Sequence, residues 1–200
     1  MKSFFSMFSD SAKEMLTRRG ICTMGLLIGL HTLVGMVTTI PIGPTIKITF
    51  AWLVLASIGM ILGPTAGFTA GVITDIIGFL VANKNGGAFH PGFTLVQALA
   101  GMFYGIFLYR AVVSKEKRDI INLAVRSVLC KICLMIFCNL LLNTYFCSII
   151  YGKGFMALLP PRIIKNLVQL PVDVIMMVAV LPVVYVAYHK IVGKKTALSN

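Results

Sequence analysis

The sequence has few charged residues, and acidic residues are the scarcest of them. Only 12% of the 200 residues are charged, and aspartate and glutamate together number six. A soluble domain carries about 25% charged residues, so the composition excludes an ordinary water-soluble globule. Apolar residues make up 58% of the chain. Because a helix needs about 20 mostly apolar residues to cross a bilayer, we expect one all-α membrane domain over residues 1–200 with six transmembrane helices and no separate soluble domain.

The sequence also lacks the usual signatures of enzymes. It contains no H-E-x-x-H, G-x-S-x-G or G-x-x-x-x-G-K-[ST] segment, and no pair of carboxylates near a histidine. We therefore expect no catalytic residues, no cofactor and no ATPase in this chain. If the protein moves a ligand uphill, a partner or an ion gradient has to supply the energy.

Cysteine patterns typical of disulfides or metal sites are weak. The five cysteines fall mostly inside apolar runs, where a thiol packs as a small hydrophobic group. Cys130 and Cys133 form a C-x-x-C pair, but neither a βαβ context nor a second pair of ligands accompanies them. We expect packing roles, with no disulfide framework and no metal.

Apolar runs between turn residues set the boundaries of the six predicted helices. Proline, glycine and polar residues gather at 38–47, 63–64, 83–92 and 148–161, and a charged stretch covers 114–126. The predicted helices are residues 21–37, 48–62, 65–82, 93–113, 127–147 and 162–189. Residues 1–20 lack the long apolar core of a signal peptide, and we expect them to form a short amphipathic segment on the membrane surface.

The basic residues indicate the orientation of the chain. The net charge is +12, but Lys and Arg gather at the ends of apolar runs and form no single stripe with aromatic residues, which does not favour nucleic acid as a partner. With the N-terminus inside, 13 of the 18 basic residues, including Lys131, lie on the cytoplasmic side and five lie outside. Because cytoplasmic loops are rich in Lys and Arg, we predict that both termini are cytoplasmic.

A row of polar residues runs along the last predicted helix. Arg162, Asn166, Gln169 and Asp173 are spaced by four, three and four residues, so an α-helix places them on one face, with Lys165 beside them. The row begins with positive charge near the outer end and finishes with an acid near mid-membrane. This gradient suits an elongated ligand with an anionic end. The alternative is that these groups bind one another between helices.

Two other predicted spans carry polar candidates. Asp75 is the second acid expected inside the membrane, where ionised groups are costly and usually face the bundle interior or a cavity. Asn139 and Asn143 are four residues apart and share a helical face. We interpret Asn139 as a link between helices, whereas Asn143 is equally compatible with a pocket and with packing. Tyr145 follows it.

The loop before the fourth predicted helix carries Phe89, His90 and Phe93 at its outer end. Aromatic and imidazole rings there can cover and stack on a planar ligand, although a single histidine is also typical of an interfacial hydrogen bond. In the first helix, Gly25 and Gly29 form a small-x-x-x-small pair that lets another helix approach closely. Packing within the bundle and docking of a separate membrane subunit are both compatible with that pair.

Four segments resemble a known family. GLLIGL at 25–30, FHPGF at 89–93, LLNTYF at 141–146 and YGKGFMALLPPRIIKN at 151–166 resemble the substrate-binding S components of energy-coupling factor (ECF) transporters, most closely the folate-specific type. The resemblance covers nearly the whole chain. It implies a bacterial cell-membrane protein with six helices and a vitamin pocket at the outer face, covered by the first, third and fifth loops.

The resemblance also implies partners. An S component captures its vitamin and then topples in the membrane against a scaffold (T) subunit, and two cytoplasmic ATPases drive the cycle. The scaffold contact of the family falls on Gly25 and Gly29, where alanines are usual. Two alternatives stay open: an S component for riboflavin, thiamine or pantothenate, and an independent secondary transporter using Asp75 and Asp173 as proton carriers.

Folate would place specific demands on the candidate residues. Its glutamate tail has two carboxylates, which Arg162 and Lys165 can pair with. The candidates for hydrogen bonds to its pterin are Asp75, Asn143, Gln169 and Asp173. The candidates for stacking on the pterin are Phe89, His90, Phe93, Tyr145 and Trp52.

Overall fold

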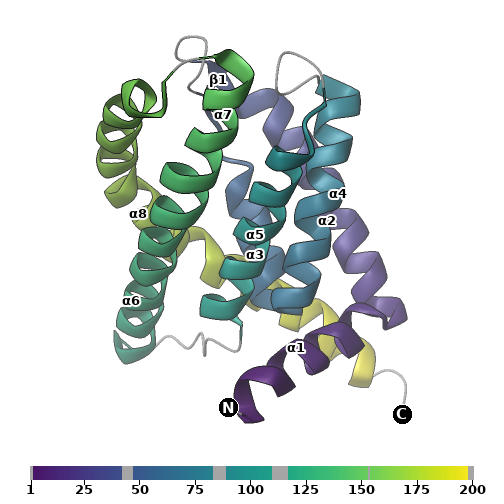
Figure 1. The fold of residues 1–200 in the computed structure, drawn as a ribbon. Coiled ribbons are helices and arrows are strands. Elements are labelled where there is room, and N and C mark those ends of the chain that lie inside the picture. Colours follow the sequence, from purple (N-terminus) through teal and green to yellow (C-terminus); the bar gives the residue numbers. More distant parts are fainter. Residues whose placement is uncertain (1, 42–46, 83–88, 110–116, 153, 198–200) are drawn as a thin grey trace.

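The chain folds into a bundle of α-helices, shown by a computed structural model in Figure 1. The structure describes residues 2–41, 47–82, 89–109, 117–152 and 154–197. Its helices are α1 (Lys2–Met15), α2 (Arg18–Thr38), α3 (Trp52–Leu62), α4 (Pro64–Ala82), α5 (Pro91–Leu108), α6 (Lys117–Cys133), the π-helix η1 (Leu134–Asn143), α7 (Thr144–Tyr151) and α8 (Phe155–Ala197). Two short strands, β1 (Ile40–Pro41) and β2 (Lys47–Ile48), form an antiparallel pair between α2 and α3.

The six apolar helices expected from the sequence are present. Within the described parts of the chain, five helical segments are long and apolar enough to cross a membrane: Arg18–Thr38, Pro64–Val81, Pro91–Leu108, Ile120–Ile150 and Phe155–Tyr188. The sixth is α3, which has only 11 residues. A helix of that length extends about 16 Å, roughly half the thickness of the hydrocarbon core.

Several helix ends differ from the prediction. The predicted connection 148–161 is helical over its first four residues, which belong to α7, and again from Phe155 onward, so Pro160 and Pro161 lie inside α8. Membrane helices tolerate proline because neighbouring groups satisfy the backbone atoms that proline leaves without a partner. The charged stretch 114–126 is also helical from Lys117, since charged side chains do not prevent a helix from extending beyond the lipid. The fourth helix ends at Leu108 rather than at residue 113.

The short helix α3 forms the centre of the bundle. Its residues Leu55, Ile58 and Leu62 are at most 1% exposed, which explains why a helix too short to span the bilayer is so apolar. The predicted reversal after α3 is confirmed, because Gly63 has a φ of 88° that an L side chain rarely adopts. Helices α4 and α5 approach so closely that a Cβ on Gly101 would overlap the backbone of Gly67.

The N-terminal segment is helical, as the amphipathic pattern predicts. Helix α1 lies at the end of the bundle where α8 also ends (Figure 1). The hydroxyl of Ser11 donates to the carbonyl of Leu62 at 2.6 Å and accepts from the backbone N–H of Thr65 at 3.1 Å. These bonds tie α1 to the turn between α3 and α4.

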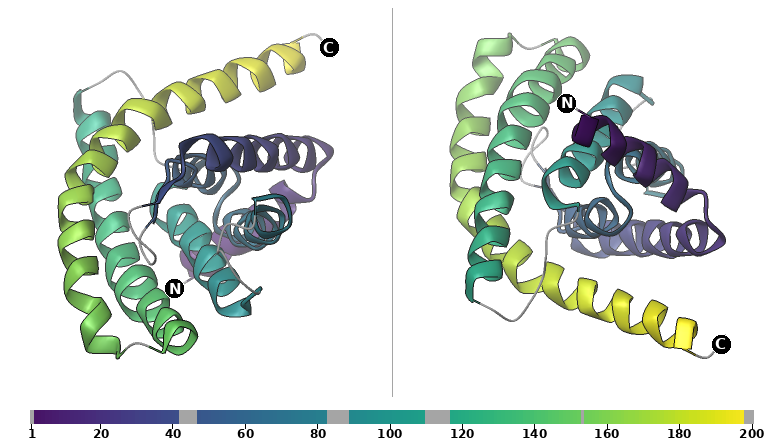
Figure 2. Two further views of the ribbon diagram at one scale, coloured as in Figure 1. Left: turned by 90° about the horizontal axis from the view of Figure 1, so that it is seen from above. Right: turned by 90° about the horizontal axis from the view of Figure 1, so that it is seen from below.

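Helix α8 is long and changes direction along its length (Figure 2). It contains Pro171 and Pro182 in addition to the two prolines near its start, and proline inside a helix is a common cause of a kink. Its residues contact α6, η1 and α7 as well as α3. One bent helix therefore packs against α6, η1 and α7 and also against α3.

Candidate ligand-binding site

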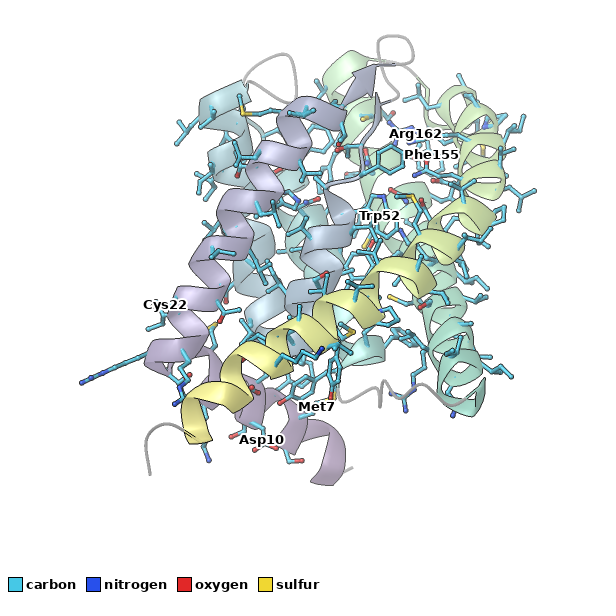
Figure 3. All side chains as sticks on the ribbon, turned by 180° about the vertical axis from the view of Figure 1, so that it is seen from behind. Met7, Asp10, Cys22, Trp52, Phe155 and Arg162 are labelled. Atoms are coloured by element: carbon cyan, nitrogen blue, oxygen red, sulfur yellow. The ribbon has the colours of Figure 1, made fainter. Side chains whose placement is uncertain are left out.

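A cavity of about 240 Å³ lies between α3, α5, α6, η1 and α8. Its volume is slightly below the roughly 300–1,000 Å³ of most small-molecule pockets. Figure 3 shows Trp52, one of the lining residues, at mid-height of the bundle. The lining residues are Thr49, Trp52, Leu55, Val96, Gln97, Ala100, Tyr104, Lys131, Leu134, Met135, Cys138, Asn139, Asn143, Lys165, Asn166, Gln169, Leu170 and Asp173.

A buried ion pair lies in the cavity wall. The ammonium of Lys131 is 2.9 Å from Oδ2 of Asp173, and the two side chains are 8% and 10% exposed. The same ammonium donates to the hydroxyl of Tyr104 at 3.2 Å and lies 3.2 Å from the ring centroid of Trp52. The pair satisfies charges that would otherwise be costly inside a membrane.

Two of the lining residues also carry a buried polar atom that has no hydrogen-bond partner among the described residues. Gln169 donates from Nε2 to Asp173 at 3.3 Å, but its Oε1 is buried without a hydrogen-bond partner among the described residues. The same holds for the indole Nε1 of Trp52. Buried polar atoms are rarely left unpaired because desolvation is costly.

The π-helix η1 supplies one face of the cavity. In a π-helix the backbone bonds join residues five apart, so residues four and five apart share a face. Leu134, Cys138, Asn139 and Asn143 are related by these spacings, and all four line the cavity. In an α-helix, residues five apart point in clearly different directions. The π-helix therefore aligns apolar and amide side chains along one wall.

The charged lining residues favour an anionic ligand. Lys131 and Lys165 are basic and Asp173 is acidic, so the described lining carries one net positive charge. Asn166 accepts a hydrogen bond from Asn139 at 3.5 Å. The sequence offered two interpretations of the polar row on α8, a ligand site and contacts between helices. Residues of the row both line the cavity and bind a neighbouring helix.

The structure brings six of the sequence candidates together. Five of them were predicted from the spans after residue 127, and the sixth is the single tryptophan. These cavity-lining candidates are Asn143, Lys165, Asn166, Gln169, Asp173 and Trp52.

Two charged candidates point elsewhere. Arg162 is buried at 8% exposure and donates to Asn143 at 3.0 Å, but it does not line the cavity. Asp75 is 5% exposed and accepts a hydrogen bond from the hydroxyl of Thr94 at 2.8 Å. It therefore lies between α4 and α5, outside the cavity lining.

The aromatic candidates form a cluster of their own. The ring centroids of His90 and Phe93 lie 5.5 and 6.5 Å from that of Phe146, and Tyr145 lies 5.7 Å from it. Phe89 packs against Phe79 on α4 instead. None of these candidates lines the cavity. The imidazole of His90 caps α5 by accepting the backbone N–H of Gly92.

Sequence reasoning missed Lys131. The sequence count placed it one turn inside the fifth predicted helix and added it to the cytoplasmic charges, whereas the structure places it in the cavity wall, so it does not report on topology. The available signal was its position inside an apolar run, because a basic residue there needs an acidic partner. Other lining residues that the sequence did not single out are Thr49, Leu55, Val96, Gln97, Ala100, Tyr104, Leu134, Met135, Cys138 and Leu170.

The pair Gly25 and Gly29 faces open space. A Cβ built on either residue meets no atom of the described residues within 4 Å. Leu26 and Leu33 on the same helix are 71% and 62% exposed. Packing within the bundle therefore does not account for these two glycines.

A membrane helix bundle with a small polar cavity at its centre defines a membrane-embedded ligand-binding protein. Sequence comparison places the chain in a specific class: the profile of the substrate-specific component of ECF transporters matches residues 19–181. The chain belongs to this family, and it is a multi-pass bacterial membrane protein. The resemblance seen in the four sequence segments is confirmed.

Its relatives include named folate transporters. The folate transporter FolT of Clostridium novyi (strain NT) is 32% identical over 132 residues, which is 66% of this chain and 70% of the relative. FolT of Streptococcus mutans serotype c is 27% identical over 169 residues, or 84% and 87% of the two chains. A crystal structure of FolT bound with folic acid superposes with a TM-score of 0.69 at 28% identity, covering 80% of this chain and 91% of the other.

Proposed function

We propose that the protein is the folate-binding subunit of an ECF transporter and that folate occupies the cavity described above. The observation that carries the proposal is the cavity wall, which combines a net positive charge, an aromatic ring and an unpaired donor and acceptor. Relatives named as folate transporters, and the likeness to FolT bound with folic acid, support folate as the ligand.

The wall suits the two chemically different ends of folate. Lys165 is a cation that can pair with a carboxylate of the glutamate tail. The flat pterin has donors and acceptors on its edges, which match Oε1 of Gln169, Nε1 of Trp52 and the carboxylate of Asp173. Asn143 and Asn166 add amide groups between these regions.

The aromatic candidates and Asp75 lie outside the cavity lining and have other proposed roles. Phe89, His90, Phe93 and Tyr145 form aromatic contacts outside the cavity lining, and we propose that they close over a bound ligand. The first and third loops, which the resemblance also implies as a cover, include residues 42–46 and 83–88, and these lie outside the described residues. Asp75 is held by Thr94, and its contact with a pterin stays a prediction.

The proposed role is binding and delivery without catalysis, with energy supplied by partners. We propose that a scaffold (T) subunit docks on the open face of α2 at Gly25 and Gly29 and that two cytoplasmic ATPases complete the transporter. Small residues that meet nothing within 4 Å support this docking, because they allow close helix approach. Membership of the ECF family supports the same partners.

We also propose that both termini are cytoplasmic. Lys131, Arg162 and Lys165 are buried or half-buried inside the bundle and do not belong in a count of loop charges. Without them, 12 of the 13 inner and three of the five outer basic residues remain. The bias towards the inner side is therefore stronger than the sequence count indicated.

Direct binding to the purified chain tests the ligand. Titration calorimetry in nanodiscs should show one folic acid bound per protein, and riboflavin, thiamine and pantothenate should not compete. Lack of binding to folic acid and reduced folates would overturn the proposal, and tight binding of another vitamin would change the ligand. Uptake by the lone chain in liposomes, driven by an ion gradient without ATPases, would instead indicate a secondary transporter.

A further inference from the structure

Arg162 lies behind the cavity wall rather than in it. Nη1 donates to Oδ1 of Asn143 at 3.0 Å and reaches Oγ1 of Thr144 at 3.5 Å. Nη2 lies 3.0 Å from Sγ of Cys147. Figure 3 shows Arg162 nearer than Trp52 to the end of the bundle opposite α1. The guanidinium of α8 is therefore engaged with side chains at the junction of η1 and α7.

These contacts fix the orientation of one amide. A guanidinium has only donors, so the Asn143 atom that it contacts has to be the carbonyl Oδ1. The thiol of Cys147 also lies 3.5 Å from this oxygen. Asn143 lines the cavity, whereas Arg162 and Cys147 do not. With the oxygen engaged behind the wall, the Nδ2 hydrogens are the polar atoms that Asn143 has left for a ligand.

The same residues hold the end of the π-helix. Asn143 is the last residue of η1, and the hydroxyl of Thr144 donates to the carbonyl of Asn139 at 3.1 Å. Arg162 contacts both residues at this junction. A buried guanidinium is costly unless several acceptors satisfy it, so these contacts constrain both the arginine and the helix end.

We propose that Arg162 is a positioning residue, which orients Asn143 so that its amide presents a hydrogen-bond donor to the cavity and favours a ligand with an acceptor at that point. The inference rests on the proposed function and specifies how its site selects an anionic, acceptor-rich vitamin. It differs from the expectation that Arg162 pairs directly with the glutamate tail. Arg162 acts on the ligand through Asn143.

A double-mutant cycle separates the two roles. The affinity for folic acid is measured by calorimetry in nanodiscs for wild type, Asn143→Ala, Arg162→Met and the double variant. Each single change should weaken binding about three- to tenfold, the effect of one lost hydrogen bond. In the Asn143→Ala background, Arg162→Met should change the affinity by less than about twofold, because the group it positions is gone. Losses that multiply would overturn the proposal.

Thermal unfolding of the same variants distinguishes positioning from a general structural role. Arg162→Met should lower the melting temperature in both backgrounds, while its effect on affinity should appear only when Asn143 is present. Cys147→Ala is the matched control. It removes the thiol near both Nη2 of Arg162 and Oδ1 of Asn143 but keeps the 3.0 Å hydrogen bond between these two residues, so the affinity should stay within about twofold of wild type. An affinity loss with Cys147→Ala equal to that of Arg162→Met would contradict the specific link to Asn143.

A conservative variant covers the case in which Arg162→Met does not fold. Arg162→Lys keeps the charge but loses the planar fork of donors, so it should weaken binding in the wild-type background and have no effect beside Asn143→Ala. Multiplying losses with this variant would overturn the inference equally. If wild type does not bind any folate, the proposed function fails. If wild type binds and the losses multiply, only the role of Arg162 fails.

Discussion

The ammonium of Lys131 lies 2.9 Å from the carboxylate of Asp173, which joins α6 to α8 inside the bundle. Both side chains are buried, and Trp52 covers the ammonium at 3.2 Å from its ring centroid. The partners are 42 residues apart in the sequence. Their contact therefore depends on the packing of the last helix and not on local structure.

Breaking this pair on one side should destabilise the fold. Lys131→Met or Asp173→Asn should each cost about 3–5 kcal/mol, because the remaining partner loses its main interaction in a buried site. The double variant Lys131→Met/Asp173→Asn should recover most of that loss, since no buried charge is left. Denaturant or SDS titration in detergent measures the change. A double variant as unstable as the sum of the two single variants would show that the two side chains do not depend on each other.

Ligand binding should alter the fluorescence of Trp52. The sequence contains one tryptophan, and it lines the cavity, so its emission reports on this site alone. Titration of folic acid should quench the emission with the midpoint found by calorimetry. Trp52→Phe is the control for inner-filter effects and should remove the signal. Unchanged Trp52 emission on binding would place the ligand outside the cavity.

Two glycines should respond oppositely to the same small substitution. Gly101→Ala should destabilise the protein by about 1–3 kcal/mol, because the new methyl group overlaps the backbone of Gly67 and forces a shift. Gly29→Ala should be neutral or stabilise by up to about 1 kcal/mol, since its methyl group meets nothing and alanine favours helix. Melting temperatures of the purified variants test this order. Equal changes in melting temperature for Gly101→Ala and Gly29→Ala would show that the two glycines do not differ in how closely they are packed.

Gly25→Leu tests the proposed docking face. A bulky side chain on the open face of α2 should prevent close approach of a scaffold helix while leaving the affinity for folic acid unchanged. ATP-driven uptake by the complete complex should fall to background. Val37→Ala on the same helix, where the side chain is 85% exposed, is the control and should transport normally. Normal uptake with Gly25→Leu would rule out this face as the contact.

The sequence predicted the helices well because their apolar runs are long and separated by turn residues. It also predicted the polar row on α8, since the spacing of Asn166, Gln169 and Asp173 fits one helical face, and all three line the cavity. Arg162 shares that spacing but turns to α7, because acceptors from another helix surround it. Spacing within one helix carries no information about partners on a neighbouring helix.

Two other features of the site could not be derived from local patterns. The sequence count adds Lys131, one turn inside the fifth predicted helix, to the cytoplasmic charges, because its partner Asp173 is distant in the sequence. The π-helix also has no distinctive composition, as LMIFCNLLLN reads equally well as an α-helix. Its widened turn brings Cys138 and Asn139 to the same wall as Leu134, which a period of 3.6 residues does not predict.

The cavity wall unites α3 with α8, which is synthesised after all the other helices that the structure describes. A nascent chain that stops before α8 can already have placed its earlier helices in the bilayer, yet it lacks one side of the binding chamber. A ligand can therefore occupy this cavity only after α8 has been made and packed. A bound ligand would bridge α3 and α8, so it should stabilise chains that contain α8 and leave shorter ones unprotected.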